Sequence, residues 1–555
     1  MMLAMLIDAS AQPRVRDNDY GTLAPLTLGS WMPTLSVSVV IPAYGAPDKL
    51  ELTLAALAAQ SYPAGLLEVV IADDGDGPPL RLPEIRPERT RIVPSLPGGW
   101  GCAHAYRSGA LVAEGDIIVR LDADMVTFQD HVEAQVRWHH LADHFVVVGH
   151  KRFVDYRPGM LTARDVHDAV ARGDAEKLFD LDQSKGHHFE AFIEKTDRLR
   201  TAGAQACRIV TGASASYHRA FYHEAGGVHS DMILGEDIEF GYRLGQAGAV
   251  FIPELASSSW HLGWSTTMTD RERATRYCKP FYANRVLTPR NRRPDPGRQW
   301  RVPGVEVVVE VTDATWERAR ATVNGLTAGL VSDIRIDLVG PWPLTHPGRR
   351  RLLDDPVLDL RLMRECFGDD GRIRLVESVR ETAFPAPYRF RCPVGWVPGR
   401  ETLNRLIALV EREGYGLVEI TLPGAGAGSE TTARFEQTRA YARARRLCGA
   451  GEHVDDLVRE MFGTHQMDAA ELGVTVRAPG DEPEAPVDWW RTAHEWKAEA
   501  DKWRDQAGAL RREMRALQAR RNRAFHRRAI RKLRQLLSRA KAGPHSAGPT
   551  GTART

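Results

Sequence analysis

The chain has 555 residues, of which 43% are hydrophobic and 26% are charged. This composition excludes a disordered chain, and the length exceeds what one hydrophobic core can organise, so we expect two or three globular units. The formal net charge of +2 hides an asymmetry, because 13 Lys/Arg and one acidic residue lie between Arg511 and Lys541. An acidic body with a basic tail is atypical of a protein that coats nucleic acid, and we predict no nucleic-acid partner.

The sequence indicates neither a membrane span nor a disulfide framework. No apolar run approaches the ~20 residues that a membrane-spanning helix needs. The apolar stretch from Met1 to Ile7 is too short for a signal peptide and carries no basic residue. The six cysteines are scattered, without a C-x-x-C pair. We therefore predict a cytoplasmic protein with reduced cysteines and no cysteine-bound metal.

The first predicted domain, 34–288, follows an N-terminal segment, 1–33. The run from Val37 to Ile41 is β-branched and typical of a buried parallel strand. A helix is expected from Asp48 to Gln60, and a second strand, Val69 to Ile71, ends in Asp73-Asp74-Gly75. A further strand, Ile117 to Leu121, runs directly into Asp122-Ala123-Asp124. The pattern predicts an α/β domain built on βαβ units.

A second α/β domain is predicted at 302–478, after a Pro- and Arg-rich linker at 289–301. Its strands at 305–309 and 334–339 flank a helix at 316–330. Shifting the first unit by 268 positions superposes Val37 on Val305 and Ile71 on Val339 without a gap, which favours one fold present twice. A chance likeness of two βαβ units is the alternative. No D-x-D sequence occurs between Arg301 and Ala478, so the second domain is predicted to be a degenerate, inactive copy.

After a second linker at 479–487, the segment 488–541 is predicted to be a basic coiled-coil helix, followed by a disordered tail at 542–555. Hydrophobic residues between 488 and 518 recur every seven positions, with a second apolar position four residues later, which predicts a homo-oligomer. These residues are Trp489, Ala493, Trp496, Ala500, Trp503, Ala507, Leu510, Met514 and Leu517. The Arg-rich stretch 511–541 matches a helix lying on an anionic membrane, peripheral at the inner face of the plasma membrane; a solubilising run of charge is the alternative.

Paired aspartates mark a candidate metal site. The D-x-D sequence occurs four times in the chain, but only Asp122 and Asp124 follow an apolar strand directly. This places both carboxylates at the carboxyl edge of a parallel sheet, where open α/β folds bind ligands. Two carboxylate donors suit Mn²⁺ or Mg²⁺, and such a cation can neutralise a diphosphate.

A second acidic cluster lies at the start of a predicted helix. Glu236, Asp237 and Glu239 fall within one turn, where they repel one another. Favourable interaction with the helix dipole is the structural explanation for acids at this position. Ser259-Trp260-His261 follows later, and a single histidine in such a context is more often structural than a metal ligand.

The order of these motifs resembles the GT-A-fold, family-2 nucleotide-sugar glycosyltransferases of the type found in bacterial cell-envelope polysaccharide synthesis. The likeness covers Val37 to His261 and consists of V-V-I-P-A-Y, A-D-D-G, R-L-D-A-D-M, G-E-D-I-E-F-G-Y-R and W-H. The resemblance implies a GT-A (Rossmann-like) first domain and a degenerate GT-A-like second domain. It also implies a role for each motif residue: Pro42, Tyr44, Asp73 and Asp74 at the nucleotide base, Asp122 at the ribose, Asp124 and His261 at the metal, Asp237 as catalytic base, and Glu236 and Glu239 on the acceptor side.

The activity implied by the resemblance is metal-dependent, inverting transfer from a nucleotide diphosphate sugar to a hydroxyl of a glycan or lipid-linked acceptor. A nucleotide-binding scaffold or pseudoenzyme and a nucleotidyltransferase are the alternatives. One motif departs from the family pattern. Many relatives have Ala-Arg-Asn-x-Gly before the D-x-D strand, whereas this chain has Ala105-Tyr106-Arg107-Ser108-Gly109. The arginine that would contact the diphosphate is therefore displaced or absent.

Overall fold

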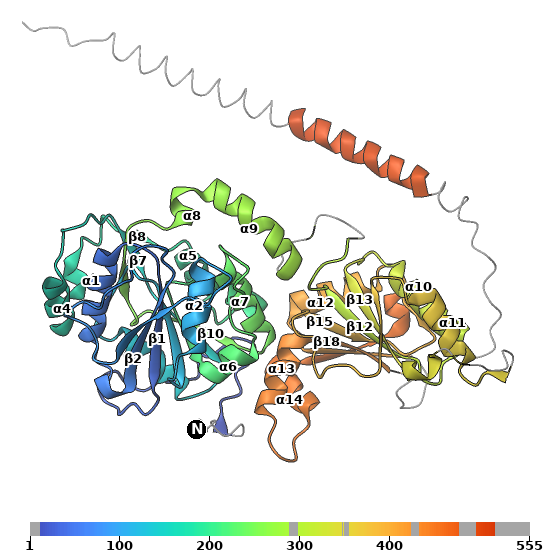
Figure 1. Cartoon of the computed structure of the whole chain (residues 1–555). Helices are drawn as coiled ribbons and strands as arrows, with labels where there is room; N and C mark the ends of the chain where they lie inside the picture. Colours follow the sequence, from blue (N-terminus) through green and yellow to red (C-terminus); the bar gives the residue numbers. More distant parts are fainter. Residues whose placement is uncertain are drawn as a thin grey trace, which may run out of the picture. The chain divides into compact units, whose positions relative to one another are not determined.

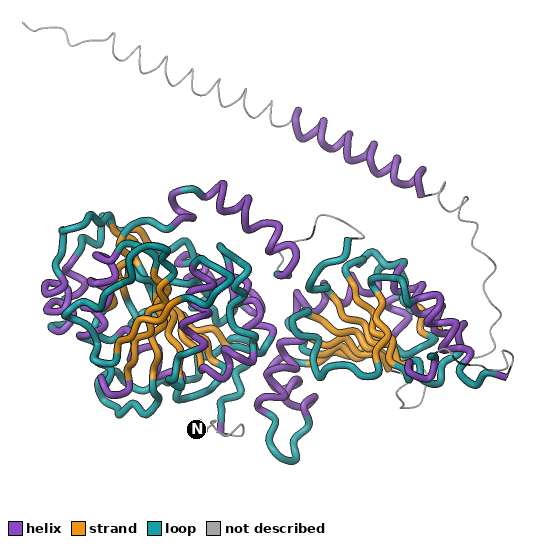
Figure 2. The backbone as a smooth tube through the Cα atoms, viewed as in Figure 1, coloured by secondary structure: helices purple, strands orange, loops and turns teal. Residues whose placement is uncertain are grey.

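The computed structural model describes residues 11–287, 293, 298–346, 348, 354–422, 432–476 and 496–516. The chain divides into two compact units, Met1–Pro479 and Gly480–Thr555. The first unit contains two α/β domains, each with a seven-stranded sheet between helices and loops (Figures 1 and 2). The described part of the second unit is one helix, 496–516.

The sheet of the first domain has the strand order β10-β6-β9-β4-β1-β2-β3. Strand β1 pairs in parallel with β2 and β4, whereas β9 runs antiparallel to β4 and β6. All seven residues of β1 are buried, as expected for a β-branched strand in the middle of a covered sheet. The strands are β1 Val37–Ala43, β2 Leu67–Asp73, β3 Thr90–Pro94, β4 Ile117–Leu121, β6 Phe145–Gly149, β9 Ser214–His218 and β10 Val250–Glu254.

Helices cover both faces of this sheet. Leucines of α1 and valines of α3 pack with β1, β2 and β4 on one face, while α2, α6 and α7 contribute to the core on the other. A smaller sheet, β5-β11-β7-β8, lies beside them. The helices are α1 Pro47–Ala58, α2 Cys102–Leu111, α3 His131–His139, α4 Ala163–Ala171, α5 Glu190–Lys195, α6 Arg219–Glu224, α7 Glu236–Gln246, α8 Thr266–Thr269 and α9 Arg271–Arg285, and the small strands are β5 Met125–Thr127, β7 Arg152–Val154, β8 Lys185–Gly186 and β11 Ser259–Leu262.

The second domain contains a sheet with the order β14-β13-β12-β15-β18-β17-β19. Its strand order along the chain and its parallel and antiparallel pairings match those of the first sheet. The strands are β12 Val305–Glu310, β13 Ile334–Val339, β14 Ile373–Val376, β15 Tyr388–Arg391, β17 Leu417–Thr421, β18 Thr432–Gln437 and β19 Thr464–Asp468, and a two-stranded sheet joins β16 Trp396–Val397 to β20 Thr475–Val476. The helices are α10 Trp316–Thr327, α11 Leu358–Phe367, α12 Thr402–Glu413, α13 Thr438–Leu447 and α14 Val454–Phe462.

The register of the two sheets corrects the ungapped shift of 268 positions. Val37 pairs with Leu67, whereas Val305 pairs with Ile334, so the connection in the second domain is one residue shorter. Ile71 therefore corresponds to Leu338 rather than to Val339. A sequence shift could not detect this difference because both positions are apolar.

The same register locates the second domain's counterparts of the D-x-D residues. Val37 pairs with Ile117 in the first sheet, and Val305 pairs with Tyr388 in the second. Counting along β4 and β15 from these pairs, Pro393 takes the place of Asp122 and Gly395 that of Asp124. This edge of the second sheet consequently has no carboxylate at the two positions that matter in the first.

Arg443 of α13 joins the second domain to the first. Its buried guanidinium donates hydrogen bonds to the carbonyl oxygens of Gly248 (2.8 Å), Ala249 (2.7 Å) and Val15 (3.1 Å). Gly248 has a φ of 95°, and a Cβ at this position would lie 2.7 Å from the Arg443 backbone nitrogen. A glycine is therefore required where the two backbones meet.

Replacing Arg443 with Met should lower the free energy of unfolding by about 2–4 kcal/mol, because several buried carbonyl groups lose their donor. The midpoint of urea unfolding, followed by tryptophan fluorescence, measures the change. Arg445→Met on the same helix is the control, because Arg445 is exposed. Equal midpoints for the two variants would show that this contact does not stabilise the first unit.

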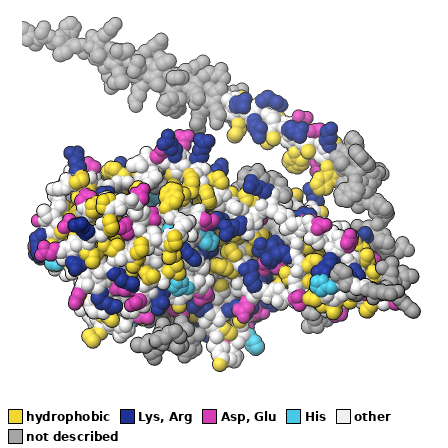
Figure 3. Space-filling model, viewed as in Figure 1, with side chains coloured by type: hydrophobic (Ala, Val, Ile, Leu, Met, Phe, Trp, Pro, Cys, Tyr) yellow, Lys and Arg dark blue, Asp and Glu magenta, His cyan; other side chains and the backbone are white. Residues whose placement is uncertain are grey.

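The helix 496–516 presents large apolar side chains to solvent. Trp496, Trp503, Leu510 and Met514 are 49%, 64%, 63% and 60% exposed, and Figure 3 shows basic and hydrophobic side chains along this helix. The predicted seam residues Trp489, Ala493 and Leu517, and most of the basic stretch 511–541, lie outside the described residues. Within the part of the chain that is described, no helix combines the length and the hydropathy needed to cross a membrane.

Candidate active site

The first sheet reverses its strand order between β1 and β4, and the candidate site lies at the carboxyl ends of these strands. From β1 the chain proceeds to β2 and β3 on one side and then returns to β4 on the other. Open α/β sheets bind ligands in the crevice outside such a switch point. Tyr44 follows β1, and Asp122 follows β4, so the sequence motifs meet at this edge as predicted from their positions at strand ends.

Asp122, Asp124 and His261 form a cluster with metal-ligand spacing. One ligand atom from each residue lies within 4.8 Å of the others, and Asp124 Oδ1 is 3.6 Å from His261 Nε2. The histidine reaches the two aspartates because β11 pairs antiparallel with β5. In this pairing His261 lies opposite Met125, the residue that follows Asp124. The structure thus brings His261 next to two aspartates that precede it by well over a hundred positions in the sequence.

The chemistry of this cluster fits a divalent cation. Asp122 Oδ1 is buried and has no hydrogen-bond partner among the described residues, and burial raises the pKa of Asp122. Burial lowers the pKa of His261, so its ring is neutral at pH 7. With Nδ1 donating to the carbonyl of Gly263 at 3.1 Å, the Nε2 lone pair points toward Asp124. Two carboxylates and a neutral imidazole are ligands that suit Mn²⁺, and Mg²⁺ accepts the carboxylates equally well.

A cavity of about 510 Å³ opens at the carboxyl ends of β1 and β2, on the edge of the sheet at which Asp122 follows β4. Tyr44 and Trp100 lie at its mouth and are 71% and 65% exposed. Its lining comes from the end of β1, the loop after β2 and the N-terminus of α2: Pro42, Ala43, Tyr44, Asp74, Asp76, Trp100, Gly101, Cys102 and Ala105. The volume and the mixture of aromatic and acidic groups are those of a small-molecule pocket.

The two aspartates at the end of β2 have different environments. Asp74 lines the cavity and accepts a hydrogen bond from the backbone of Gly101 at 2.6 Å, which ties the loop after β2 to the start of α2. Asp73 is not among the lining residues. Its carboxylate accepts hydrogen bonds from the backbone nitrogens of Gly75 (3.0 Å) and Leu80 (3.2 Å), and so fixes the shape of the loop.

Asp76 and Trp100 were missed as site residues by sequence reasoning. Asp76 belongs to one of the four D-x-D pairs, which by itself is a weak signal. Trp100 stands in the run Pro97-Gly98-Gly99-Trp100-Gly101, directly before α2. A large aromatic residue in a glycine-rich turn at the carboxyl edge of the sheet is a sequence signal that could have predicted Trp100 as a binding residue.

Asp237 lies in the first turn of α7, partly exposed. Its Oδ2 accepts a hydrogen bond from the Gly212 backbone at 3.1 Å, and its Oδ1 accepts one from Ile238 at 2.7 Å. The helix is preceded by Gly235 with a φ of 83°, and a Cβ there would lie 2.2 Å from the Tyr282 hydroxyl of α9. Only glycine allows α9 to pack this closely over the start of α7.

The two glutamates beside Asp237 are held inside the domain by arginines. Glu236 accepts a hydrogen bond from Arg120 of β4 at 2.7 Å, and both side chains are buried. Burial raises the pKa of Glu236. Glu239 accepts two hydrogen bonds from Arg243, each at 2.8 Å. Although burial disfavours its charge, hydrogen bonds from His229 and Arg243 lower the pKa of Glu239 to about 2. Of the three acids in this turn, Asp237 is the one with access to the open side.

Comparisons with known proteins agree with this picture of the first domain. Residues 38–216 match the model of glycosyl transferase family 2. The hyaluronan synthase of Pasteurella multocida is 24% identical over 239 residues, which cover 39% of this chain and 23% of that protein. The chondroitin synthase of Escherichia coli is 23% identical over 240 residues, covering 40% of this chain and 34% of that protein. The chain thus spans a quarter to a third of the length of these curated relatives.

Among solved structures, a mannosyltransferase from Pyrobaculum calidifontis, in complex with GDP-Man and Mn²⁺, is 18% identical. The match covers 49% of this chain and 70% of that one, with a TM-score of 0.33. GalNAc-T7 with UDP, GalNAc and Mn²⁺ is 17% identical, covering 47% of this chain and 53% of that one, with a TM-score of 0.30.

Proposed function

We propose that this protein is a family-2 glycosyltransferase with a GT-A fold, which transfers a sugar from a nucleotide diphosphate sugar to a hydroxyl group of a glycan or lipid-linked acceptor; the match of residues 38–216 to the model of glycosyl transferase family 2 supports the family. The observation that carries the proposal is the cluster of Asp122, Asp124 and His261 at the strand switch point, with a cavity at the same edge of the sheet. A nucleotidyltransferase or a scaffold would have no use for Asp237 at the open side of the same site.

The cavity is suited to the nucleotide of the donor. Tyr44 and Trp100 offer exposed aromatic faces on which a base can stack, and Asp74 and Asp76 can accept its N–H groups. Asp122 lies at the end of β4, next to β1, and is assigned to the ribose. The diphosphate then extends toward Asp124 and His261, where a bound Mn²⁺ or Mg²⁺ would neutralise the charge of the leaving group.

Asp237 is the group that can take the acceptor's proton. In the proposed reaction the acceptor oxygen bonds to the anomeric carbon as the bond from that carbon to the diphosphate oxygen breaks. The electron pair leaves with the nucleotide diphosphate, and the acceptor's proton passes to Asp237. Attack from the side opposite the leaving group inverts the anomeric configuration. Its hydrogen bonds to Gly212 and Ile238 fix the carboxylate in position before the acceptor arrives.

For the rest of the chain we propose supporting roles. The second domain, with Pro393 and Gly395 at the D-x-D positions, is proposed to be a degenerate copy that stabilises the first through contacts such as that of Arg443. The exposed tryptophans of helix 496–516 favour self-association. Peripheral contact of 511–541 with an anionic membrane would keep the enzyme near a lipid-linked acceptor in cell-envelope polysaccharide synthesis.

The donor site can be tested by thermal unfolding with a panel of nucleotide sugars and Mn²⁺, followed by radiolabelled transfer assays with the donor that stabilises most. A saturating ligand should raise the unfolding midpoint by an amount that grows with its concentration. Trp100→Ala should raise the donor KM about tenfold and leave kcat nearly unchanged, because base stacking on an aromatic ring contributes roughly 1–3 kcal/mol.

Trp503→Ala serves as the control for this experiment, because Trp503 is equally exposed but lies in the second unit. Absence of stabilisation by every nucleotide sugar, together with absence of transfer, would overturn the proposed function. An unchanged donor KM in Trp100→Ala would remove the stacking role alone.

A further inference from the structure

Lys151 is a buried lysine that has no role in the steps proposed above. It immediately precedes β7 and is 5% exposed. In the pairing of β7 with β11, Phe153 lies opposite His261. Side chains two positions apart on an extended strand project from the same face, so Lys151 points to the side on which the metal ligand His261 lies.

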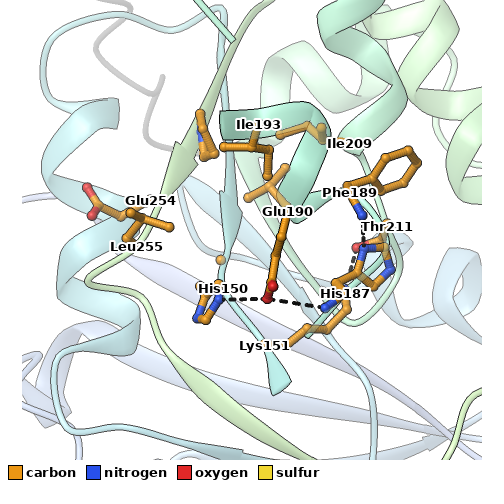
Figure 4. A pocket seen from close by; sticks show the side chains of 13 residues that line it. His150, Lys151, His187, Phe189, Glu190, Ile193, Ile209, Thr211, Glu254 and Leu255 are labelled. Atoms are coloured by element: carbon orange, nitrogen blue, oxygen red, sulfur yellow. Dashed lines mark hydrogen bonds and ion pairs between the residues drawn. The ribbon is translucent and has the colours of Figure 1, made fainter. Parts of the chain in front are cut away.

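The lysine also lies next to the catalytic base. Its Nζ donates a hydrogen bond to Thr211 Oγ1 at 2.5 Å, and the next residue, Gly212, donates its backbone N–H to Asp237. Figure 4 shows Lys151 and Thr211 in the wall of a cavity of about 40 Å³ that His150, His187 and Glu190 also line. Lys151 is thus within electrostatic reach of both Asp122 of the metal cluster and Asp237.

Burying the ammonium group of Lys151 costs free energy that a purely structural residue would not need to spend. An ammonium group has three N–H donors, and among the described residues its hydrogen bond is to the neutral hydroxyl of Thr211. Burial lowers the pKa of Lys151 to about 8, while Asp122 and Asp237 oppose this, so the group is still mostly charged at pH 7. A buried charge without an ion-pair partner is usually retained for a function.

Two other basic side chains of the first domain, Arg107 and Lys49, are engaged by protein groups. Arg107, the arginine of the divergent A-Y-R-S-G motif, donates to the carbonyls of Val228 (3.1 Å) and Gly226 (3.4 Å). Lys49 is bonded to the carbonyl of Leu262 and lies 3.4 Å from Asp124. Lys151, by contrast, has the neutral hydroxyl of Thr211 as its hydrogen-bond partner.

We infer that the Lys151 ammonium contacts the β-phosphate of the nucleotide diphosphate and stabilises the negative charge that develops there as the bond to the sugar breaks. The inference rests on the proposed function and names a further catalytic residue for the same reaction. Lys151 donates hydrogen bonds and keeps its proton throughout, so the leaving group departs as the diphosphate anion. It supplies a positive charge that Arg107 of the divergent motif, bonded to the carbonyls of Gly226 and Val228, does not supply.

The inference can be tested by calorimetric titration of nucleoside mono- and diphosphates into the full chain with Mn²⁺, using the nucleotide that binds the wild type best. Lys151→Met should weaken diphosphate binding about tenfold or more and leave monophosphate binding unchanged, because only the diphosphate has the β-phosphate. Lys151→Arg should retain most of the difference between the two nucleotides. Lys177→Met, an exposed lysine on another element, is the matched control.

Each other outcome has a defined meaning. Equal loss of mono- and diphosphate binding in Lys151→Met would show a structural role and overturn the inference. Should that variant not fold, as judged by its unfolding transition, Lys151→Gln gives the same comparison. A wild-type protein that binds no nucleoside diphosphate would instead contradict the proposed function.

Discussion

Asp237→Asn will reduce the rate of sugar transfer by a factor of about 10²–10⁴, the contribution typical of a general base. Asparagine has nearly the same size as aspartate and can still accept the Gly212 N–H, but it cannot take a proton from the acceptor hydroxyl. Donor binding should therefore survive while kcat falls. The rate is measured by transfer of radiolabelled sugar at saturating donor.

Asp168→Asn is the control for this experiment, because Asp168 is a partly exposed aspartate on α4. A fall in turnover of less than about tenfold for Asp237→Asn would assign the base to another residue. Asp237 would then be explained as an acid that complements the N-terminal dipole of α7.

Asp124→Ala will abolish detectable transfer and eliminate the stabilisation of the protein by Mn²⁺. Removing this carboxylate leaves His261 as the one proposed metal ligand, too few to hold a divalent cation against water, and the diphosphate then departs with its charge uncompensated. An excess of chelator should have the same effect on the wild type, and added Mn²⁺ should restore activity. Both activity and the unfolding midpoint with and without Mn²⁺ are measured.

The chain contains its own control for the metal prediction. Asp180 and Asp182 form a second D-x-D pair, which is exposed, and Asp182→Ala should leave activity and Mn²⁺ stabilisation intact. Full activity of the wild type in excess chelator would mean that the ammonium group of Lys49 or Lys151, rather than a metal ion, neutralises the leaving group.

Much of the first domain could be predicted from its sequence, because its signals are local. The strands at 37–41, 69–71 and 117–121 are confirmed within β1, β2 and β4, since β-branched runs and strand-end acids are visible without tertiary information. Asp122 and Asp124 could be selected from four D-x-D pairs by the apolar strand before them. Their proximity to His261 is confirmed by the structure.

The parts of the site that escaped prediction depend on partners that are distant in the sequence. From the sequence alone, Glu236 and Glu239 are predicted to lie on the acceptor side. In the structure, Arg120 pairs with Glu236 inside the domain, although the two residues are 116 positions apart. The residues around Trp100 show no helical or strand periodicity, so the sequence does not place this tryptophan on a helix or a strand. Lys151 reads as an ordinary surface lysine until the pairing of β7 with β11 buries it.

The contact of Arg443 has a consequence for the order in which the protein can mature. This side chain supplies hydrogen bonds to Val15 and to Ala249, which precede it by 428 and 194 positions. During synthesis on a ribosome, the edge of the catalytic domain formed by the N-terminal segment and β10 therefore waits for α13 to emerge before its carbonyl groups find their donor. The second domain thus acts as the closing part of the first, which gains these hydrogen bonds only after α13 has been synthesised.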